Sequence, residues 1–162
     1  MNKVYLLIGG NMGDRMANLT TALNQLEQEA GAIKTLSSIY ETAAWGYTNQ
    51  PHFLNQALLL ETEMNAHDLM ECLLRIERNM GRERNVPLGP RTIDLDIIYF
   101  NSDIINTSLV SVPHPRLSER KFVLLPLVEI APHYLHPVFN KNNTLLLKEC
   151  GDSLALYKKT NL

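Results

Sequence analysis

The chain has little that would tie it to a membrane or to a disulfide-stapled secreted scaffold. Its two cysteines, Cys72 and Cys150, form neither a metal-binding spacing nor a disulfide framework. No apolar run approaches the roughly 20 residues that cross a bilayer. The amino terminus lacks the small-residue cleavage site of a signal peptide. We therefore expect a cytoplasmic protein with no membrane partner.

Charge of one sign is also scarce, because the formal net charge is only −2. A balance this close to zero produces no field for nucleic acid, so any anion must bind through a local group of basic residues. Hydrophobic residues make up 45% of the 162 residues, which is ample for one core. With no repeat or linker, residues 1–162 are expected to form one domain, and a monomer is expected because no apolar surface patch can be identified.

Hydrophobic spacing and capping residues predict the order strand, helix, strand, strand, helix, strand. This order is typical of an α+β protein with a ferredoxin-like βαββαβ antiparallel sheet and both helices on one face. A short helical stretch near 120–130 and a weakly patterned tail form a C-terminal extension. The expected elements are strands over 4–8, 32–42, 53–64 and 93–100 and helices over 14–30 and 65–80.

Two acidic residues interrupt the most apolar predicted strand. Asp94 and Asp96 stand two residues apart, so their side chains point to one side of the strand, with Cα atoms about 7 Å apart. Two such carboxylates repel each other unless a positive charge neutralises them. Mg²⁺ binds one or two carboxylates together with water and substrate phosphates. The pair therefore predicts a site for magnesium and ATP.

The alternative is that one or both of these aspartates are solvated at a strand end. Their neighbours argue against it, since the strand is expected to be apolar on both faces and hence central. Ile98 and Phe100 are expected to continue the face of the aspartates, whereas Leu95, Ile97 and Tyr99 cover the other. Acids at the start of a central strand need a partner, which favours the metal site.

Basic residues gather on both sides of the acidic pair. Guanidinium groups match phosphate oxygens in a bidentate way. Such a set is by itself usually a solvated face, but beside a magnesium site it indicates a polyphosphate clamp. The set comprises Arg82, Arg84, Arg91, Arg116, Arg120 and Lys121.

Other positions admit two interpretations each. His114 lies between two prolines that restrict its backbone, and is either a phosphate hydrogen-bond donor or a structural histidine. Phe53 and Asn55 share a strand face, where they could stack and read a flat heterocycle or simply belong to the core. Glu77 lies at the boundary of the second helix's apolar stripe. The Gly-Gly-Asn-Met-Gly segment at 9–13 lacks the ending of a phosphate-binding loop and is interpreted as a turn.

Together these segments resemble the 6-hydroxymethyl-7,8-dihydropterin pyrophosphokinase family of folate biosynthesis. The resemblance covers roughly residues 3–132 and keeps the family's order of motifs. Its segments are Gly9-Gly10-Asn11 with Gly13-Asp14-Arg15, Tyr40-Glu41-Thr42, Gln50-Pro51-His52-Phe53-Leu54-Asn55, Gly89-Pro90-Arg91-Thr92-Ile93-Asp94-Leu95-Asp96-Ile97 and Val112-Pro113-His114-Pro115-Arg116-Leu117.

The resemblance implies an enzyme that moves the β,γ-diphosphate of ATP to the hydroxymethyl oxygen of the pterin, releasing AMP. It implies two Mg²⁺ ions on Asp94 and Asp96, with Arg82 and Arg91 also catalytic. It assigns to ATP Glu77, Arg84, Ser111, His114, Arg116 and Arg120. It assigns to the pterin Thr42, Ala43, Ala44, Trp45, Phe53, Asn55 and Phe122.

The sequence departs from the family pattern at Gly10, at Ala43 and Ala44, and at Leu88, where serine, prolines and an aromatic residue are usual. These differences bear on affinity more than on the reaction type. Two other functions stay open on the residues alone. One is another Mg²⁺-dependent phosphotransferase or phosphohydrolase with a different acceptor, and the other is a ferredoxin-like binding module without catalysis.

Overall fold

The computed structural model describes residues 1–43, 49–81, 91–153 and 156–159. The helices are α1 (Arg15–Glu29), α2 (Ala66–Asn79), α3 (Lys121–Ile130) and α4 (Asn143–Glu149), with a short 3₁₀ turn at Leu117–Glu119. The strands are β1 (Asn2–Gly10), β2 (Ala32–Leu36), β3 (Ile39–Thr42), β4 (Phe53–Thr62), β5 (Asp94–Phe100), β6 (Ile105–Asn106), β7 (Ser111–Val112) and β8 (Leu156–Lys159).

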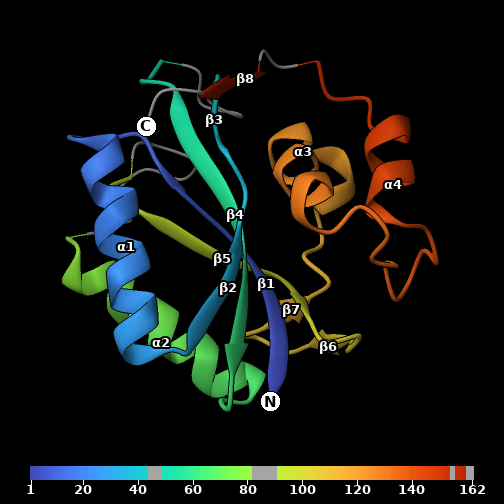
Figure 1. Cartoon of the computed structure of the whole chain (residues 1–162), viewed down its shortest axis with the longest axis horizontal. Helices are drawn as coiled ribbons and strands as arrows, with labels where there is room; N and C mark the ends of the chain where they lie inside the picture. Colours follow the sequence, from blue (N-terminus) through green and yellow to red (C-terminus); the bar gives the residue numbers. More distant parts are fainter. Residues whose placement is uncertain (44–48, 82–90, 154–155, 160–162) are drawn as a thin grey trace.

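An antiparallel sheet in the order β5-β1-β4-β3-β8 crosses the middle of the molecule, and β2 also pairs with β4. The helices α1 and α2 lie on one side of it, and α3 and α4 lie on the other (Figure 1). This confirms the predicted α+β ferredoxin-like arrangement with α1 and α2 sharing one face. None of the helices within the described residues is long and apolar enough to cross a membrane.

Both long helices begin where their capping residues predict. The Asp14 side chain accepts a hydrogen bond from the backbone N–H of Ala17 at the start of α1, and Asn65 does the same for Asp68 at the start of α2. These caps fix where each helix leaves the sheet. The segment before α1, which belongs to the site described below, is therefore held at its far end.

The strand expected over 32–42 is divided at Ser37 into β2 and β3. The backbone N–H of Ser37 donates to the carbonyl of Ala57, while its hydroxyl accepts from the N–H of Ala57. The Ser37 hydroxyl thus accepts the hydrogen bond that a backbone carbonyl would accept in a regular strand pair, and the regular pairing stops at this residue. β3 then resumes against β4 and extends to Thr42, which faces the site.

The face under α1 and α2 carries a continuous apolar core. On β1 and β4 it takes alternate residues, as the period of a strand requires. Burial is nearly complete, with Leu6, Leu58 and Ile76 each 0% exposed. The sheet contributes Val4, Leu6, Ile8, Leu54, Leu58, Leu60, Leu95 and Ile97, and the helices contribute Leu19, Ala22, Leu26, Leu69, Cys72, Leu73 and Ile76.

The opposite face has a smaller apolar core that leaves one end of the sheet open. Leu7, Ala57, Ile98 and Tyr99 pack there against α3 and α4. The Tyr99 hydroxyl donates to the side-chain oxygen of Asn143 at 2.7 Å, which joins the strand to the C-terminal extension. The extension contains α4 and β8, which the sequence pattern did not predict.

The predicted sides of Tyr99 and Phe100 are wrong. Tyr99 belongs to the core under α3, together with Ile98, whereas Phe100 belongs to the core under α1 and α2. The pairing of β1 with β5 shifts register between Tyr5 and Leu6, which is the position of a β-bulge. The extra residue exchanges the two faces beyond it. The alternation up to Ile97 is unaffected, so the acidic pair keeps its expected side.

Candidate active site

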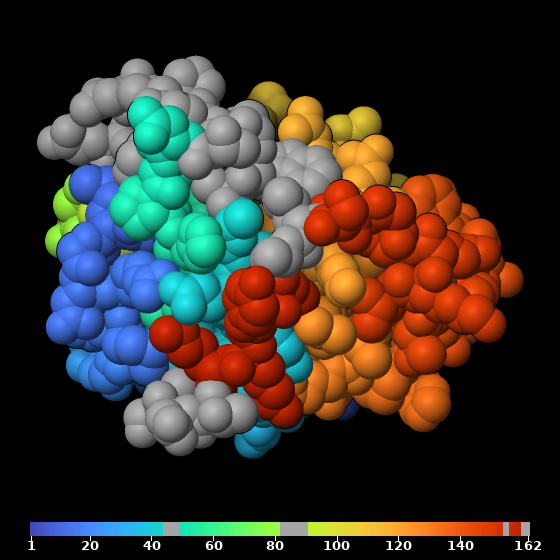
Figure 2. All heavy atoms as spheres, turned by 90° about the horizontal axis from the view of Figure 1, so that it is seen from above, coloured from blue at the N-terminus to red at the C-terminus, as the bar shows by residue number. Residues whose placement is uncertain are grey.

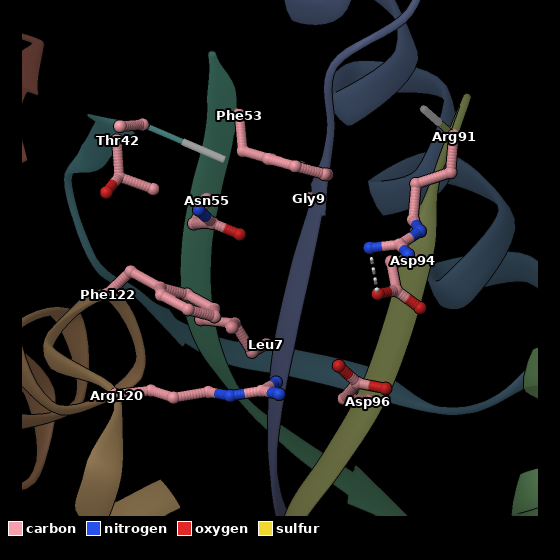
Figure 3. Close-up of a pocket in the computed structure, with 11 residues that line it drawn as sticks. Leu7, Gly9, Thr42, Phe53, Asn55, Arg91, Asp94, Asp96, Arg120 and Phe122 are labelled. Atoms are coloured by element: carbon pink, nitrogen blue, oxygen red, sulfur yellow. Dashed lines mark ion pairs between the residues drawn. The ribbon is translucent and has the colours of Figure 1, made fainter. Parts of the chain in front are cut away.

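A pocket opens at the uncovered end of the sheet, on the face that carries α3 (Figure 3). In an antiparallel sheet the end of one strand lies beside the start of the next. The ends of β1 and β3 therefore meet the starts of β4 and β5 there. The pocket is lined by Leu7, Gly9, Thr42, Ala43, Phe53, Asn55, Arg91, Asp94, Asp96, Arg120 and Phe122.

The two aspartates project from β5 into this pocket, as predicted (Figure 3). A nitrogen of the Arg91 guanidinium lies 3.6 Å from a carboxylate oxygen of Asp94. The side chain of Asp94 is 28% exposed, so it is open to a ligand. Asp96 lies two residues farther along the same face. The pocket therefore has a wall of carboxylate oxygens with an arginine beside it.

Two arginines stand between the acids and the aromatic rings. The guanidinium carbon of Arg91 lies 5.4 Å from the centre of the Phe53 ring, and that of Arg120 lies 5.7 Å from the centre of the Phe122 ring. Arg120 reaches across from α3 toward Asp96 (Figure 3). Burial lowers the pKa of Arg120, and Arg116 adds to this, while Asp96 and Asp94 oppose it. An arginine stays charged at such a shift.

Asn55 presents a buried hydrogen-bond donor to the pocket. The residue is 5% exposed, and its side-chain nitrogen has no hydrogen-bond partner within the described part of the chain. A buried polar group without a partner costs stability unless a ligand supplies one. A flat heterocycle between the rings of Phe53 and Phe122 would offer acceptor atoms at its edge. The geometry thus supports the predicted role of Asn55.

Gly9 makes room for this amide. A Cβ atom at Gly9 would lie 2.3 Å from the side-chain oxygen of Asn55, so no other residue fits without moving the amide. Gly9 and Gly10 are the last residues of β1, not part of a turn as predicted. The pocket-lining roles of Leu7 and Gly9 were missed, although a glycine at the end of a strand signals a close approach.

Asn11 connects three segments around the pocket, a role that the sequence did not reveal. It is 2% exposed. Its amide nitrogen donates to the side-chain oxygen of Gln50 and to the carbonyl of Pro51, both at 2.9 Å. Its amide oxygen accepts from the backbone N–H of Arg91, also at 2.9 Å. Asn11 therefore fixes the chain just before β4 and just before β5.

His114 lies beside β5 and is not among the residues that line the pocket. Its backbone N–H donates to the carbonyl of Ile98, and its Nδ1 accepts from the backbone N–H of Arg116. An acceptor at Nδ1 leaves the proton of the neutral ring on Nε2. Burial, followed by the charge of Arg120, lowers the pKa of His114 to about 4, against the opposing effect of Asp94. His114 is therefore a neutral Nε2–H donor near pH 7.

Glu77 is placed differently from the other predicted ligands. It is 3% exposed, and its carboxylate accepts from the backbone N–H of Leu95 at 2.8 Å, between the two aspartates. It thus positions the strand from behind and does not line the pocket. Ser111 and Arg116 are exposed and also lie outside the lining set. Four predicted residues, Ala44, Trp45, Arg82 and Arg84, lie outside the described residues.

The donor set suits magnesium better than a transition metal. No group of three or more His, Cys, Asp and Glu side chains converges in the part of the chain that the structure describes. Two carboxylates on one strand offer only oxygen ligands. Mg²⁺ accepts such a partial set, because water and substrate phosphates complete its six positions. The residues present therefore fit magnesium bound together with a polyphosphate.

Comparison with known proteins agrees with this geometry. Residues 5–132 match the family described as 7,8-dihydro-6-hydroxymethylpterin-pyrophosphokinase (HPPK). The chain is 48% identical over 130 residues to the 2-amino-4-hydroxy-6-hydroxymethyldihydropteridine pyrophosphokinase of Bacillus subtilis, covering 80% of this chain and 78% of that protein. It is 40% identical over 141 residues to the protein of the same name from Aquifex aeolicus, covering 87% of this chain and 88% of that one.

Other relatives are longer. The chain is 39% identical to the mitochondrial folate synthesis bifunctional protein of Pisum sativum, covering 79% of this chain and 25% of that protein. Its fold matches a solved structure of Plasmodium falciparum HPPK-DHPS with a TM-score of 0.77 at 18% identity, covering 91% of this chain and 45% of the other. The fold, the pocket and the sequence match agree, and the chain belongs to the 7,8-dihydro-6-hydroxymethylpterin-pyrophosphokinase family.

Proposed function

We propose that Asp94 and Asp96 hold the magnesium ions with which this pyrophosphokinase of folate biosynthesis transfers diphosphate from ATP to 6-hydroxymethyl-7,8-dihydropterin. The observation that carries the proposal is the division of one pocket into two walls. Carboxylates line one wall. Aromatic rings and an amide nitrogen that lacks a partner among the described residues line the other, and an arginine marks each boundary. Family membership favours this reaction over another phosphotransferase and over a binding module.

The aromatic wall is proposed to bind the pterin. The rings of Phe53 and Phe122 stack on the two faces of the heterocycle. The amide of Asn55 donates to an edge acceptor, and Thr42 and Ala43 line the same side of the pocket. Ala44 and Trp45 are assigned to this wall by the family resemblance alone. Their part in pterin binding remains a prediction.

The opposite wall is proposed to bind the triphosphate of ATP. Arg91 and Arg120 neutralise the phosphate charge, and His114 donates a hydrogen bond from Nε2. The pterin hydroxyl oxygen attacks the β-phosphorus, the bond from that phosphorus to the α,β-bridging oxygen breaks, and AMP leaves. Alignment and charge neutralisation supply most of the rate enhancement in such a displacement. Glu77 supports the acidic strand through Leu95.

The magnesium ions would supply charge neutralisation at the attacking and leaving oxygens. Two ions are expected, held by Asp94 and Asp96. Asp96 is also the carboxylate toward which Arg120 points, and it is our candidate to receive the hydroxyl proton. Arg82, Arg84, Ser111 and Arg116 complete the set of proposed ATP contacts. No described contact carries these last assignments.

We also propose that residues 1–162 form one domain that acts as a cytoplasmic monomer. All strands but the β6–β7 hairpin belong to one sheet within the described residues. Sedimentation at micromolar concentration tests the monomer. A mass of two chains would contradict it.

The function is tested by identifying the nucleotide product. The purified protein is mixed with ATP, Mg²⁺ and the pterin, and nucleotides are separated by chromatography. We expect AMP, formed only when both pterin and Mg²⁺ are present. Formation of ADP would mean that a single phosphoryl group moves, and would contradict the proposal. A matched reaction with a chelator tests the magnesium requirement. Pterin binding is followed in the same sample by pterin fluorescence, which shows that the chelated protein is still folded.

A further inference from the structure

The C-terminal end of the described chain touches two of the three elements that form the aromatic wall, namely β3 and the start of α3. We define the C-terminal strap as residues 150–153 and 156–159. It lies beyond residues 5–132, which match the family. In the view from above, the red C-terminal residues lie next to β3 and beside the orange helices (Figure 2).

The first contact of the strap is with the start of α3. The N-cap position of this helix is Arg120, which makes no side-chain capping bond. Its side chain has no acceptor and extends into the pocket instead. The missing cap comes from Asp152, whose carboxylate accepts from the backbone N–H of Lys121 at 3.0 Å. A carboxylate at a helix N-terminus also interacts favourably with the helix dipole.

This cap acts next to two pocket residues. Lys121 stands between Arg120 and Phe122, and both of these line the pocket. Because the first turn of a helix frays without a cap, Asp152 holds the backbone from which both side chains extend. The usual local solution, a serine or aspartate at the N-cap, is incompatible with an arginine that serves the pocket. A distant residue has taken over the capping role.

The second contact of the strap is with β3. The strand β8 pairs antiparallel with it, and Leu156 lies opposite Thr42. Lys159 lies at the other end of β8, and its ammonium is 3.3 Å from a carboxylate oxygen of Glu41. Glu41 also pairs with Arg15, and this bond, followed by the one to Lys159, lowers the pKa of Glu41. β3 is thereby paired on both edges up to the residue that lines the pocket.

We infer that the C-terminal strap is a positioning element for the pterin wall, holding Thr42 and Phe122 at the spacing that the heterocycle requires. It does not contact Asp94, Asp96 or Arg91 through any bond described. Its effect should therefore fall mainly on pterin affinity. Pairing of β8 with β3 should leave ATP affinity nearly unchanged, whereas the Asp152 cap should affect ATP affinity through Arg120, but less than it affects pterin affinity. The inference rests on the proposed pterin site.

Three variants separate the two contacts. A chain ending at Ser153 removes β8 and keeps the cap. Asp152→Ala removes the cap and keeps β8, and Asp152→Asn restores an acceptor oxygen without the charge. Lys141→Ala breaks the ion pair with Glu149 on the outside of the C-terminal extension and serves as a matched control. Dissociation constants are measured by titrating pterin in the presence of a non-hydrolysable ATP analogue with Mg²⁺, and by titrating the analogue alone.

We expect the pterin dissociation constant to rise at least about fivefold in Asp152→Ala, because a lost cap is typically worth ~1 kcal/mol. A similar rise is expected in the chain ending at Ser153, because β3 there loses its pairing with β8. Asp152→Asn should recover most of the affinity, and Lys141→Ala should match the wild type. The analogue should bind Lys141→Ala and the chain ending at Ser153 within about twofold of the wild type. In Asp152→Ala it should weaken by a smaller factor than the pterin does, because Arg120 adjoins the cap.

Equal weakening of pterin and analogue would show a merely structural role and overturn the inference. So would unchanged pterin affinity in both Asp152→Ala and the shortened chain. If the shortened chain fails to fold, Asp152→Ala and its asparagine rescue still decide the case. A wild-type protein that binds no pterin would refute the proposed function itself, which is a distinct result.

Discussion

The two faces of the sheet are made by the same strands and differ in how completely helices cover them. The face under α1 and α2 is mostly apolar, from Val4 to Ile8 on β1 and from Leu54 to Leu60 on β4, and is interrupted there by the buried Gln56. The face under α3 and α4 is apolar only in part, and its uncovered end carries the pocket. Residues that stabilise the fold therefore lie largely on one face of the sheet, and residues of the pocket lie on the other. Neighbouring residues of one strand belong to opposite faces.

The difference follows from two free-energy costs, that of exposing apolar side chains to water and that of burying charged ones. An apolar strand face must be covered, and two amphipathic helices do so on one side. Charged side chains such as Asp94 and Asp96 keep access to solvent or to a counter-charge, so a helix cannot close over them. The comparison predicts that substitutions on one face change stability, whereas those on the other change activity.

The largest effect is expected at the acidic pair. Asp96→Asn should lower the turnover rate by roughly three orders of magnitude, because the proposed metal-binding charge is lost where phosphate charge develops. The fold should be retained, since one of two mutually repelling carboxylates becomes neutral. Steady-state AMP formation and thermal unfolding measure the two quantities. Asp103→Asn, in an exposed position after β5, is the matched control.

A near-normal rate in folded Asp96→Asn would contradict the assignment of catalysis to the open face, because a carboxylate of the pocket would then not be needed for turnover. A large fall in stability together with activity would blur it instead, and would mean that the acidic pair supports the sheet.

The next effect belongs to the covered face. Leu58 is 0% exposed and lies opposite Leu6 in the sheet. Leu58→Ala should lower the free energy of unfolding by about 2–5 kcal/mol through lost burial and a residual cavity. The KM values for ATP and pterin should stay within about twofold in the folded fraction. Urea unfolding and kinetics at low temperature check both, and a selective rise in the KM for pterin would contradict the separation of faces.

A smaller effect is expected at Asn55 on the open face, whose amide nitrogen lacks a partner within the part of the chain that the structure describes. Asn55→Ala removes a buried donor, so the pterin dissociation constant should rise roughly 10-fold to 100-fold. Stability should be unchanged or slightly raised, because the free protein no longer buries that group without a partner. Fluorescence titration with pterin gives the affinity. An equal loss of affinity for the ATP analogue would show that the two walls are not separate.

The smallest effect is expected at His136, which packs against Tyr99 in the part of the molecule that carries α3. It concerns the pH dependence of stability. His136 is 4% exposed, and its Nδ1 accepts from the backbone N–H groups of Val138 and Phe139. Burial lowers the pKa of His136 below its ordinary value of 6.5. At pH values between the pKa of His136 in the folded and in the unfolded chain, the unfolded chain binds more protons. The free energy of unfolding therefore rises with pH there, and the contribution of the neutral His136 is lost on acidification.

His136→Gln should remove this part of the pH dependence, because an amide does not titrate. Urea unfolding between pH 5 and pH 7 gives the slopes of wild type and variant. His133→Gln, at an exposed position, should keep the wild-type slope. Identical slopes in His136→Gln and wild type would show that the buried ring does not contribute.

Much of the site could be read from the sequence because its signals are local. Asp94 and Asp96 share a side through the period of one strand, and so do Phe53 and Asn55. The capping residues Asp14 and Asn65 act within a few residues of themselves, so the starts of α1 and α2 were also predictable. These patterns need no knowledge of distant contacts, and the structure confirmed each of them.

Contacts between distant segments could not be read in this way. The bulge that exchanges Tyr99 and Phe100 depends on how β5 pairs with β1, and the division at Ser37 depends on β4. Asn11 looked like a turn residue because its partners Gln50 and Arg91 lie 39 and 80 positions away. A side chain's partner at such distances is chosen by the fold.

The amino-acid sequence by itself therefore determined the reaction class, the acidic pair and the order of the elements up to β5, apart from the division of one predicted strand into β2 and β3. Only the tertiary structure decided that Glu77 supports the strand from behind, that Gly9 yields space to Asn55, and that Asp152 caps α3. The reason is the range of the interactions. Periodicity and capping act over a few residues, whereas packing, register and long-range hydrogen bonds exist only once the chain has folded.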